Sequence, residues 1–108
     1  MTIRINTDLI DSWTSFHQVF KIALGFPDFY GANMDAWIDC MTDIDDPNSG
    51  MTRLTVEPNA TVLIELVNSE NFRKSHEDIY FALLDCVAFV NMRKINENSH
   101  TLIAVASM

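Results

Sequence analysis

The sequence has few basic side chains and, over one long stretch, none at all. No lysine or arginine lies between Lys21 and Arg53, and the 108 residues contain 7 Lys and Arg against 15 Asp and Glu, a formal net charge of -8. A protein that binds nucleic acid or an anionic membrane needs a basic patch. The composition therefore argues against both partners and favours a cationic protein, met through electrostatic steering.

Cysteines and long apolar runs are also scarce. Cys40 and Cys86 are the only cysteines, and they do not form a C-x-x-C pair. No apolar run reaches the length of about 18 residues that spans a bilayer, and the first residues lack the apolar stretch of a signal peptide. We therefore expect a reducing, cytoplasmic location. Because 48% of the residues are hydrophobic, we predict one globular domain over residues 1–108.

Apolar periodicity predicts a strand and two helices in the first half of the chain. Ile3 and Ile5 alternate with polar residues, as in a short strand. Apolar residues then recur at helical spacing over residues 12–24, and Gly25 is placed to end that helix. A second helix is expected to begin after Asn33 and to end near residue 42.

The second half is predicted to complete a small parallel sheet. Residues 43–58 read as a long irregular loop. Residues 60–67 are an almost unbroken aliphatic run, which is typical of a central strand buried on both faces. A helical stretch over residues 70–94, broken near residues 75 and 76, precedes a last strand over residues 101–106. This order predicts an α/β fold in which a three-stranded parallel sheet packs with about four helices.

Six aspartates lie in the stretch without basic residues: Asp28, Asp35, Asp39, Asp43, Asp45 and Asp46. Asp35, Asp39 and Asp43 are spaced four residues apart, so a helix places them on one face. Like charges at this spacing destabilise a helix by about 0.2–0.5 kcal/mol per pair. Since no cation nearby in the sequence relieves this repulsion, the stripe is predicted to face a positively charged partner. Apolar residues of the same helix fall on the neighbouring arc and are predicted to face the core: Met34, Trp37, Ile38 and Met41.

Residues 26–43, FPDFYGANMDAWIDCMTD, closely resemble the barstar family of intracellular ribonuclease inhibitors. The positions that match the family pattern are Pro27, Tyr30, Gly31, Asn33, Asp35, Ala36, Asp39, Cys40 and Thr42. Residues 16–18, Phe-His-Gln, are similar to part of the first helix in that family, and the strand–helix–strand ending fits in outline. The resemblance therefore covers most of the chain and implies the barstar-like α/β fold.

The resemblance implies that this helix and the loop before it block a ribonuclease active site. Such a site is lined with cations that bind RNA phosphates. A carboxylate on a rigid helix can take a phosphate position and accept charge-assisted hydrogen bonds from arginine. In the family the residue that matches Asp39 has this role, and the one that matches Asp35 supports it. The other implied or neighbouring partner-binding residues are Phe29, Gly31, Asn33, Met34, Ile38, Asp43 and, as the nearest acidic residue on the last helix, Asp85.

Three departures from the family pattern affect which ribonuclease is the target. Phe29 stands where the family usually has tyrosine, so a phenolic hydroxyl is missing. The Leu-Trp pair of the family is replaced by Trp37-Ile38, which moves the tryptophan to the predicted core face. The loop after Thr42 is longer than the pattern leads us to expect, and it either extends or shields the interface.

The residues do not indicate a catalytic or metal-binding set. The three histidines are scattered, and residues 43–50 fail the EF-hand spacing whether Asp43 or Asp45 is taken first. We predict no catalytic residue, no metal and no cofactor. The favoured interpretation is an immunity protein of a toxin–antitoxin pair, monomeric when free, that inhibits a basic ribonuclease. The alternatives are an interaction module of the same fold with another basic protein partner, and a metal-dependent hydrolase built on the aspartate stripe.

Overall fold

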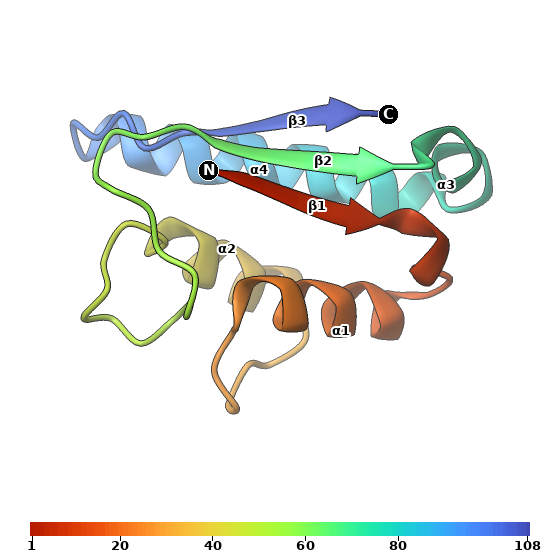
Figure 1. The fold of residues 1–108 in the computed structure, drawn as a ribbon, viewed down its shortest axis with the longest axis horizontal. Helices are drawn as coiled ribbons and strands as arrows, with labels where there is room; N and C mark the ends of the chain where they lie inside the picture. The colour runs from red at the N-terminus through yellow and green to blue at the C-terminus, as the bar shows by residue number, and fades with distance from the viewer.

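The computed structural model describes residues 1–108 and contains a three-stranded sheet (Figure 1). In chain order the elements are β1 (Thr2–Asn6), the 3₁₀ helix η1 (Thr7–Leu9), α1 (Trp13–Leu24), α2 (Met34–Thr42), β2 (Val62–Val67), α3 (Ser69–Ser75), α4 (Glu77–Asn96) and β3 (Ile103–Ser107). The strands are parallel in the order β1-β2-β3, with Ile64 of β2 paired to Ile3 and Val105. The predicted α/β fold, with a three-stranded parallel sheet and four helices, is confirmed.

Only one face of the sheet is buried, so the prediction that the central strand is buried on both faces was wrong. In β2, Ile64 and Leu66 are fully buried, whereas Leu63 and Glu65 on the other face are only half-buried. The sheet order follows the chain order, and crossovers of one hand in such a sheet place their helices on the same side. On the open face Arg4 and Glu65 form an ion pair 3.4 Å long.

Local sequence signals set the helix ends. The Ser12 hydroxyl accepts a hydrogen bond from the Ser15 N–H, and the Ser15 hydroxyl accepts one from the Ser12 N–H, so the two residues form a capping box. At the other end of α1, Gly25 has a φ of +68°, and a Cβ there would lie 2.6 Å from the Cβ of Arg53. His76 separates α3 from α4, close to the predicted break.

The hydrophobic core lies between the sheet and the helices and contains 21 buried side chains. Trp37 of α2 is wholly buried, as its position on the helix predicts, and its ring meets Phe20 of α1 edge-on at 5.8 Å. The indole Nε1 of Trp37 has no hydrogen-bond partner. Burying such a donor costs about 1–3 kcal/mol, which the packing of this large ring has to offset. Trp37 therefore anchors α2 through the apolar area that its ring buries and not through a hydrogen bond.

The segment between α2 and β2 has no helix or strand, as predicted, but it is packed against the rest of the fold. Its buried side chains are Ile44, Thr52 and Val56. The backbone N–H groups of Arg53 and Leu54 donate to the Leu24 carbonyl, which holds the middle of the loop against the end of α1 (Figure 1). Asp35 and Asp39 remain exposed, so the long loop does not shield them.

Candidate protein-binding site

The loop between α1 and α2 is anchored by Tyr30. Its ring packs on Phe26 at 4.7 Å, and its hydroxyl lies 2.6 Å from Nδ1 of His17 in α1. Burial lowers the pKa of His17 and raises that of Tyr30. The two side chains therefore form a hydrogen bond between a neutral imidazole and a neutral phenol, whose donor is set by the tautomer of His17. Because Tyr30 faces inward, the neighbouring Phe29 is left at the loop surface with 77% of its area exposed.

The end of this loop shapes the start of α2. The Asn33 Oδ1 accepts a hydrogen bond from the Ala36 N–H at 2.8 Å, and its Nδ2 donates to the Gly31 carbonyl at 3.3 Å. A Cβ on Gly31 would lie 3.1 Å from that amide nitrogen. Ala32 has a φ of +51°, a left-handed conformation that costs alanine about 1–2 kcal/mol. Gly31 and Asn33, both exposed, thus lie on either side of a strained residue, and such strain is frequent at functional sites.

Helix α2 presents its carboxylates and its apolar residues on neighbouring faces. Asp35 and Asp39 are exposed, whereas Met34 and Ile38 are half-buried at the edge of the core. Asp43 is the C-cap residue, just past the last helical position, and is also half-buried. Burial, reinforced by nearby carboxylates, raises the pKa of Asp43. The open part of the predicted stripe therefore consists of Asp35 and Asp39.

A cation from α4, distant from this stripe in the sequence, pairs with one of its carboxylates and relieves part of the repulsion. Arg93 donates from Nη1 to Oδ1 of Asp39 at 3.0 Å. The same guanidinium lies 5.2 Å from the centre of the Phe89 ring. The side chains of Arg93 and Asp39 are 40% and 60% exposed, so the pair contributes only about 0–1 kcal/mol to stability. Arg93 and Phe89 are not among the residues predicted from the sequence, and their i,i+4 spacing on α4 was the only signal.

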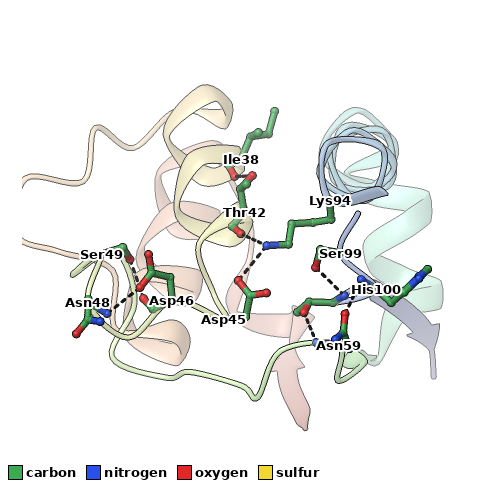
Figure 2. A network of polar contacts seen from close by, with 11 residues as sticks. Ile38, Thr42, Asp45, Asp46, Asn48, Ser49, Asn59, Lys94, Ser99 and His100 are labelled. Carbon is green, nitrogen blue, oxygen red and sulfur yellow. Dashed lines mark hydrogen bonds and ion pairs between the residues drawn. The ribbon is translucent and has the colours of Figure 1, made fainter. Parts of the chain in front are cut away.

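The next residue of α4, Lys94, extends into the protein at the end of α2 (Figure 2). Its Nζ donates to the Thr42 carbonyl and to the Asp45 carboxylate, both at 2.9 Å, and only 5% of Lys94 is exposed. Burial alone would raise the pKa of Asp45, but the hydrogen bond and charge of Lys94 bring it below its usual range. Lys94 therefore fixes the end of α2 and removes Asp45 from the carboxylates open to a partner.

Asp85, the acidic residue predicted on the last helix, is exposed on α4. It lies two residues from the buried Leu83 and from the buried Val87, and therefore on the side of the helix turned away from the core. Burial raises the pKa of the neighbouring Cys86 thiol, and the carboxylates of Asp85 and Asp35 add to this rise. No ion pair joins Asp85 to α2, so its contact with a partner stays a prediction.

The buried contact between His17 and Tyr30 predicts how stability depends on pH. The pKa of His17 is lowered in the folded protein from 6.5, so the unfolded chain binds this proton more readily. The contribution of His17 is fully present above about pH 6.5 and is lost as the pH falls through the lower, folded-state pKa. Urea unfolding at pH 8, 7, 6 and 5 should show this loss in the wild type and in a control, His100→Gln. A His17→Gln profile parallel to the wild-type profile would contradict the assignment.

These features define a class of protein: a small α/β fold with an exposed acidic helix and a structured loop before it. The chain matches the family described as Barstar (barnase inhibitor) over residues 1–105. It therefore belongs to the barstar family, as the resemblance of residues 26–43 implied. The match supports a ribonuclease-inhibitor role at the level of the family, which is a family of inhibitors and not of enzymes.

Two further observations concern metals and membranes. No three His, Cys, Asp or Glu side chains are grouped so that they could hold a metal ion. Asp46, in the segment that invited a calcium-loop interpretation, accepts a hydrogen bond from the Asn48 N–H in a local turn. None of the helices has both the length and the apolar content that crossing a membrane requires.

Proposed function

We propose that this protein inhibits a basic ribonuclease of the barnase kind by inserting α2 and the preceding loop into the enzyme's active site. The observation that carries the proposal is the pair of exposed carboxylates, Asp35 and Asp39, on a helix held at both ends. Asn33 caps its first turn, and Lys94 binds the carbonyl of its last residue. Membership of the barstar family supports the same function.

The mechanism is occlusion by charge mimicry. A ribonuclease active site uses cations to bind phosphates. The carboxylate of Asp39 takes a phosphate position and accepts charge-assisted hydrogen bonds from an arginine fork. Asp35 adds a second carboxylate one turn earlier, with Asp43 and Asp85 at the margins. Because Trp37 fixes the opposite side of α2 in the core, little backbone order has to be gained on binding.

The loop before α2 supplies the apolar part of the contact. Phe29 is the most exposed aromatic residue of the chain, and aromatic rings at the centre of an interface often contribute strongly to binding. A site that stacks RNA bases accepts a flat ring, which Phe29 offers without a hydroxyl. At Gly31 and Asn33 the partner can approach the backbone of the loop closely. Met34 and Ile38 add apolar surface at the edge of the contact. The protein acts as a cytoplasmic immunity protein that is monomeric when free.

The direct test is titration of RNA hydrolysis by barnase with the purified protein. We expect loss of hydrolysis in proportion to the inhibitor added, and no hydrolysis by the inhibitor alone. A pull-down from the native cell, followed by the same assay on any basic protein that is captured, extends the test to other ribonucleases. The proposal fails if barnase stays active at saturating inhibitor and no captured protein degrades RNA. A captured basic protein without nuclease activity would instead favour an interaction module with another partner.

The charge of the protein predicts how the rate of association depends on salt. With a net charge of -8, association with a basic ribonuclease should slow steeply as salt rises from 0.05 to 0.5 M (on the order of tenfold or more), while dissociation changes much less. Stopped-flow mixing with barnase at several salt concentrations measures both rates. An association rate that does not change with salt would contradict the steering argument.

A further inference from the structure

The carboxylate proposed to bind the ribonuclease is already bound within the free protein. Oδ1 of Asp39 accepts a hydrogen bond from Nη1 of Arg93 at 3.0 Å. Arg93 comes from α4, 54 positions further along the chain, so the pair exists only because α2 and α4 pack together. Asp39 is therefore already paired with a cation in the free protein, because one of its two oxygens accepts a hydrogen bond from the Arg93 guanidinium.

The guanidinium has a second support that keeps it near the surface. Phe89 lies one turn before Arg93 on α4, and its ring centre is 5.2 Å from the guanidinium carbon. Such a cation–π contact is attractive at an exposed site. Phe89 is itself 44% exposed, so ring and guanidinium together form part of the surface beside Asp39. Arg93 is thus held beside the carboxylate rather than extended into solvent.

Arg93 opposes a contact between Asp39 and an arginine of the partner, whether Arg93 stays beside Asp39 or moves away. A bidentate contact uses both oxygens of Asp39; Oδ1 can still accept a second hydrogen bond, but the Arg93 guanidinium beside it already partly neutralises the carboxylate. If Arg93 stays, two guanidinium groups share one carboxylate, and like charges placed together across an interface oppose binding. If Arg93 leaves, its ion pair and its place between Asp39 and Phe89 are lost. Either route weakens the complex relative to an otherwise identical protein without the arginine.

We infer that Arg93 is an affinity-limiting residue: an internal counter-ion that competes with the ribonuclease for Asp39. This inference rests on the proposed function and adds to it which residue of the inhibitor opposes binding. The alternative role, in which Arg93 holds Asp39 in the geometry that the partner needs, predicts the opposite effect of its removal. The two roles therefore predict changes of opposite sign in the affinity for the ribonuclease when Arg93 is removed.

The experiment compares binding of barnase by wild type, Arg93→Ala, Arg93→Lys and Arg73→Ala at low salt. Arg73 lies in the last turn of α3, is exposed and makes no ion pair, so its removal changes the net charge equally without touching Asp39. We expect Arg93→Ala to bind at least about fivefold more tightly than wild type, and Arg73→Ala at most about twofold. Arg93→Lys keeps the charge and should stay near wild type. Urea melts check that each variant is folded.

A double-mutant cycle shows whether Arg93 acts through Asp39. In an Asp39→Asn background, removing Arg93 should no longer increase affinity beyond the Arg73→Ala control. An Arg93→Ala protein that binds no more tightly than Arg73→Ala, or more weakly than wild type, overturns the inference while leaving inhibition by wild type intact. If neither wild type nor Arg93→Ala binds barnase, both the proposed function and the role of Arg93 are wrong for this enzyme.

Discussion

Replacing Asp39 by alanine is expected to weaken binding to the ribonuclease by about 2–5 kcal/mol, on the order of 30-fold to several-thousand-fold. The loss is large because the enzyme's phosphate-binding cations stay buried in the complex without their counter-charge. Arg93 of the inhibitor does not reduce this loss, because it is itself a cation and cannot supply the negative charge that the enzyme's cations lose. Isothermal titration calorimetry against barnase measures the change.

The same substitution should leave the free energy of unfolding within about 1 kcal/mol of wild type. Asp39→Ala removes an exposed pair worth about 0–1 kcal/mol. It also removes repulsion with Asp35 and introduces the best helix former. Asp78→Asn, an exposed carboxylate in the first turn of α4, serves as the matched control and should change neither quantity strongly. A clearly destabilised Asp39→Ala protein that still inhibits at full strength would disprove the assigned role.

Replacing Lys94 by methionine is expected to lower the free energy of unfolding by about 3 kcal/mol, the lower end for a buried pair, because the half-buried Asp45 carboxylate loses its partner. The side chains of Lys94 and Asp45 are 7% and 15% exposed, so water can replace the lost ammonium only in part. Urea unfolding measures the change.

Two controls accompany the Lys94 measurement. Lys94→Met combined with Asp45→Asn should recover part of the loss, since the unpaired charge is then removed. Lys74→Met breaks an ion pair with Glu70 whose side chains are 66% and 78% exposed, and it should cost less than about 0.5 kcal/mol. Equal effects of the two lysine substitutions would show that burial of Lys94 does not matter.

Features that depend on neighbours in sequence were predictable. Ser12, Gly25 and Asn33 mark helix ends through hydrogen bonds to residues a few positions away, and the burial of Trp37 follows from helical spacing. The acidic stripe and the family motif likewise lie within one short segment. Local physics and the resemblance together therefore placed α2, its cap and its exposed carboxylates correctly.

Features that depend on the packing of distant segments were not predictable. The pairs Asp39–Arg93 and Asp45–Lys94 join residues 54 and 49 positions apart, and no spacing rule connects them. The prediction that the central strand is buried on both faces was wrong for a related reason. The aliphatic run of β2 shows that the strand is apolar, but only the path of the crossovers decides how many faces are covered. Whether residues 29–43 and 85 contact a ribonuclease stays a prediction.

Arg93 and Lys94 are adjacent in the chain, but Arg93 lies at the surface and Lys94 is buried. The two positions therefore differ in the substitutions that they tolerate. Position 93 lies at the surface, where a substitution alters the competition for Asp39 at little cost to the fold. Position 94 can change safely only when Asp45 changes with it, because the charge of the buried Lys94 is balanced by the half-buried Asp45. A lineage adapting to a new ribonuclease can therefore drift at position 93, while positions 45 and 94 are expected to covary or to stay fixed.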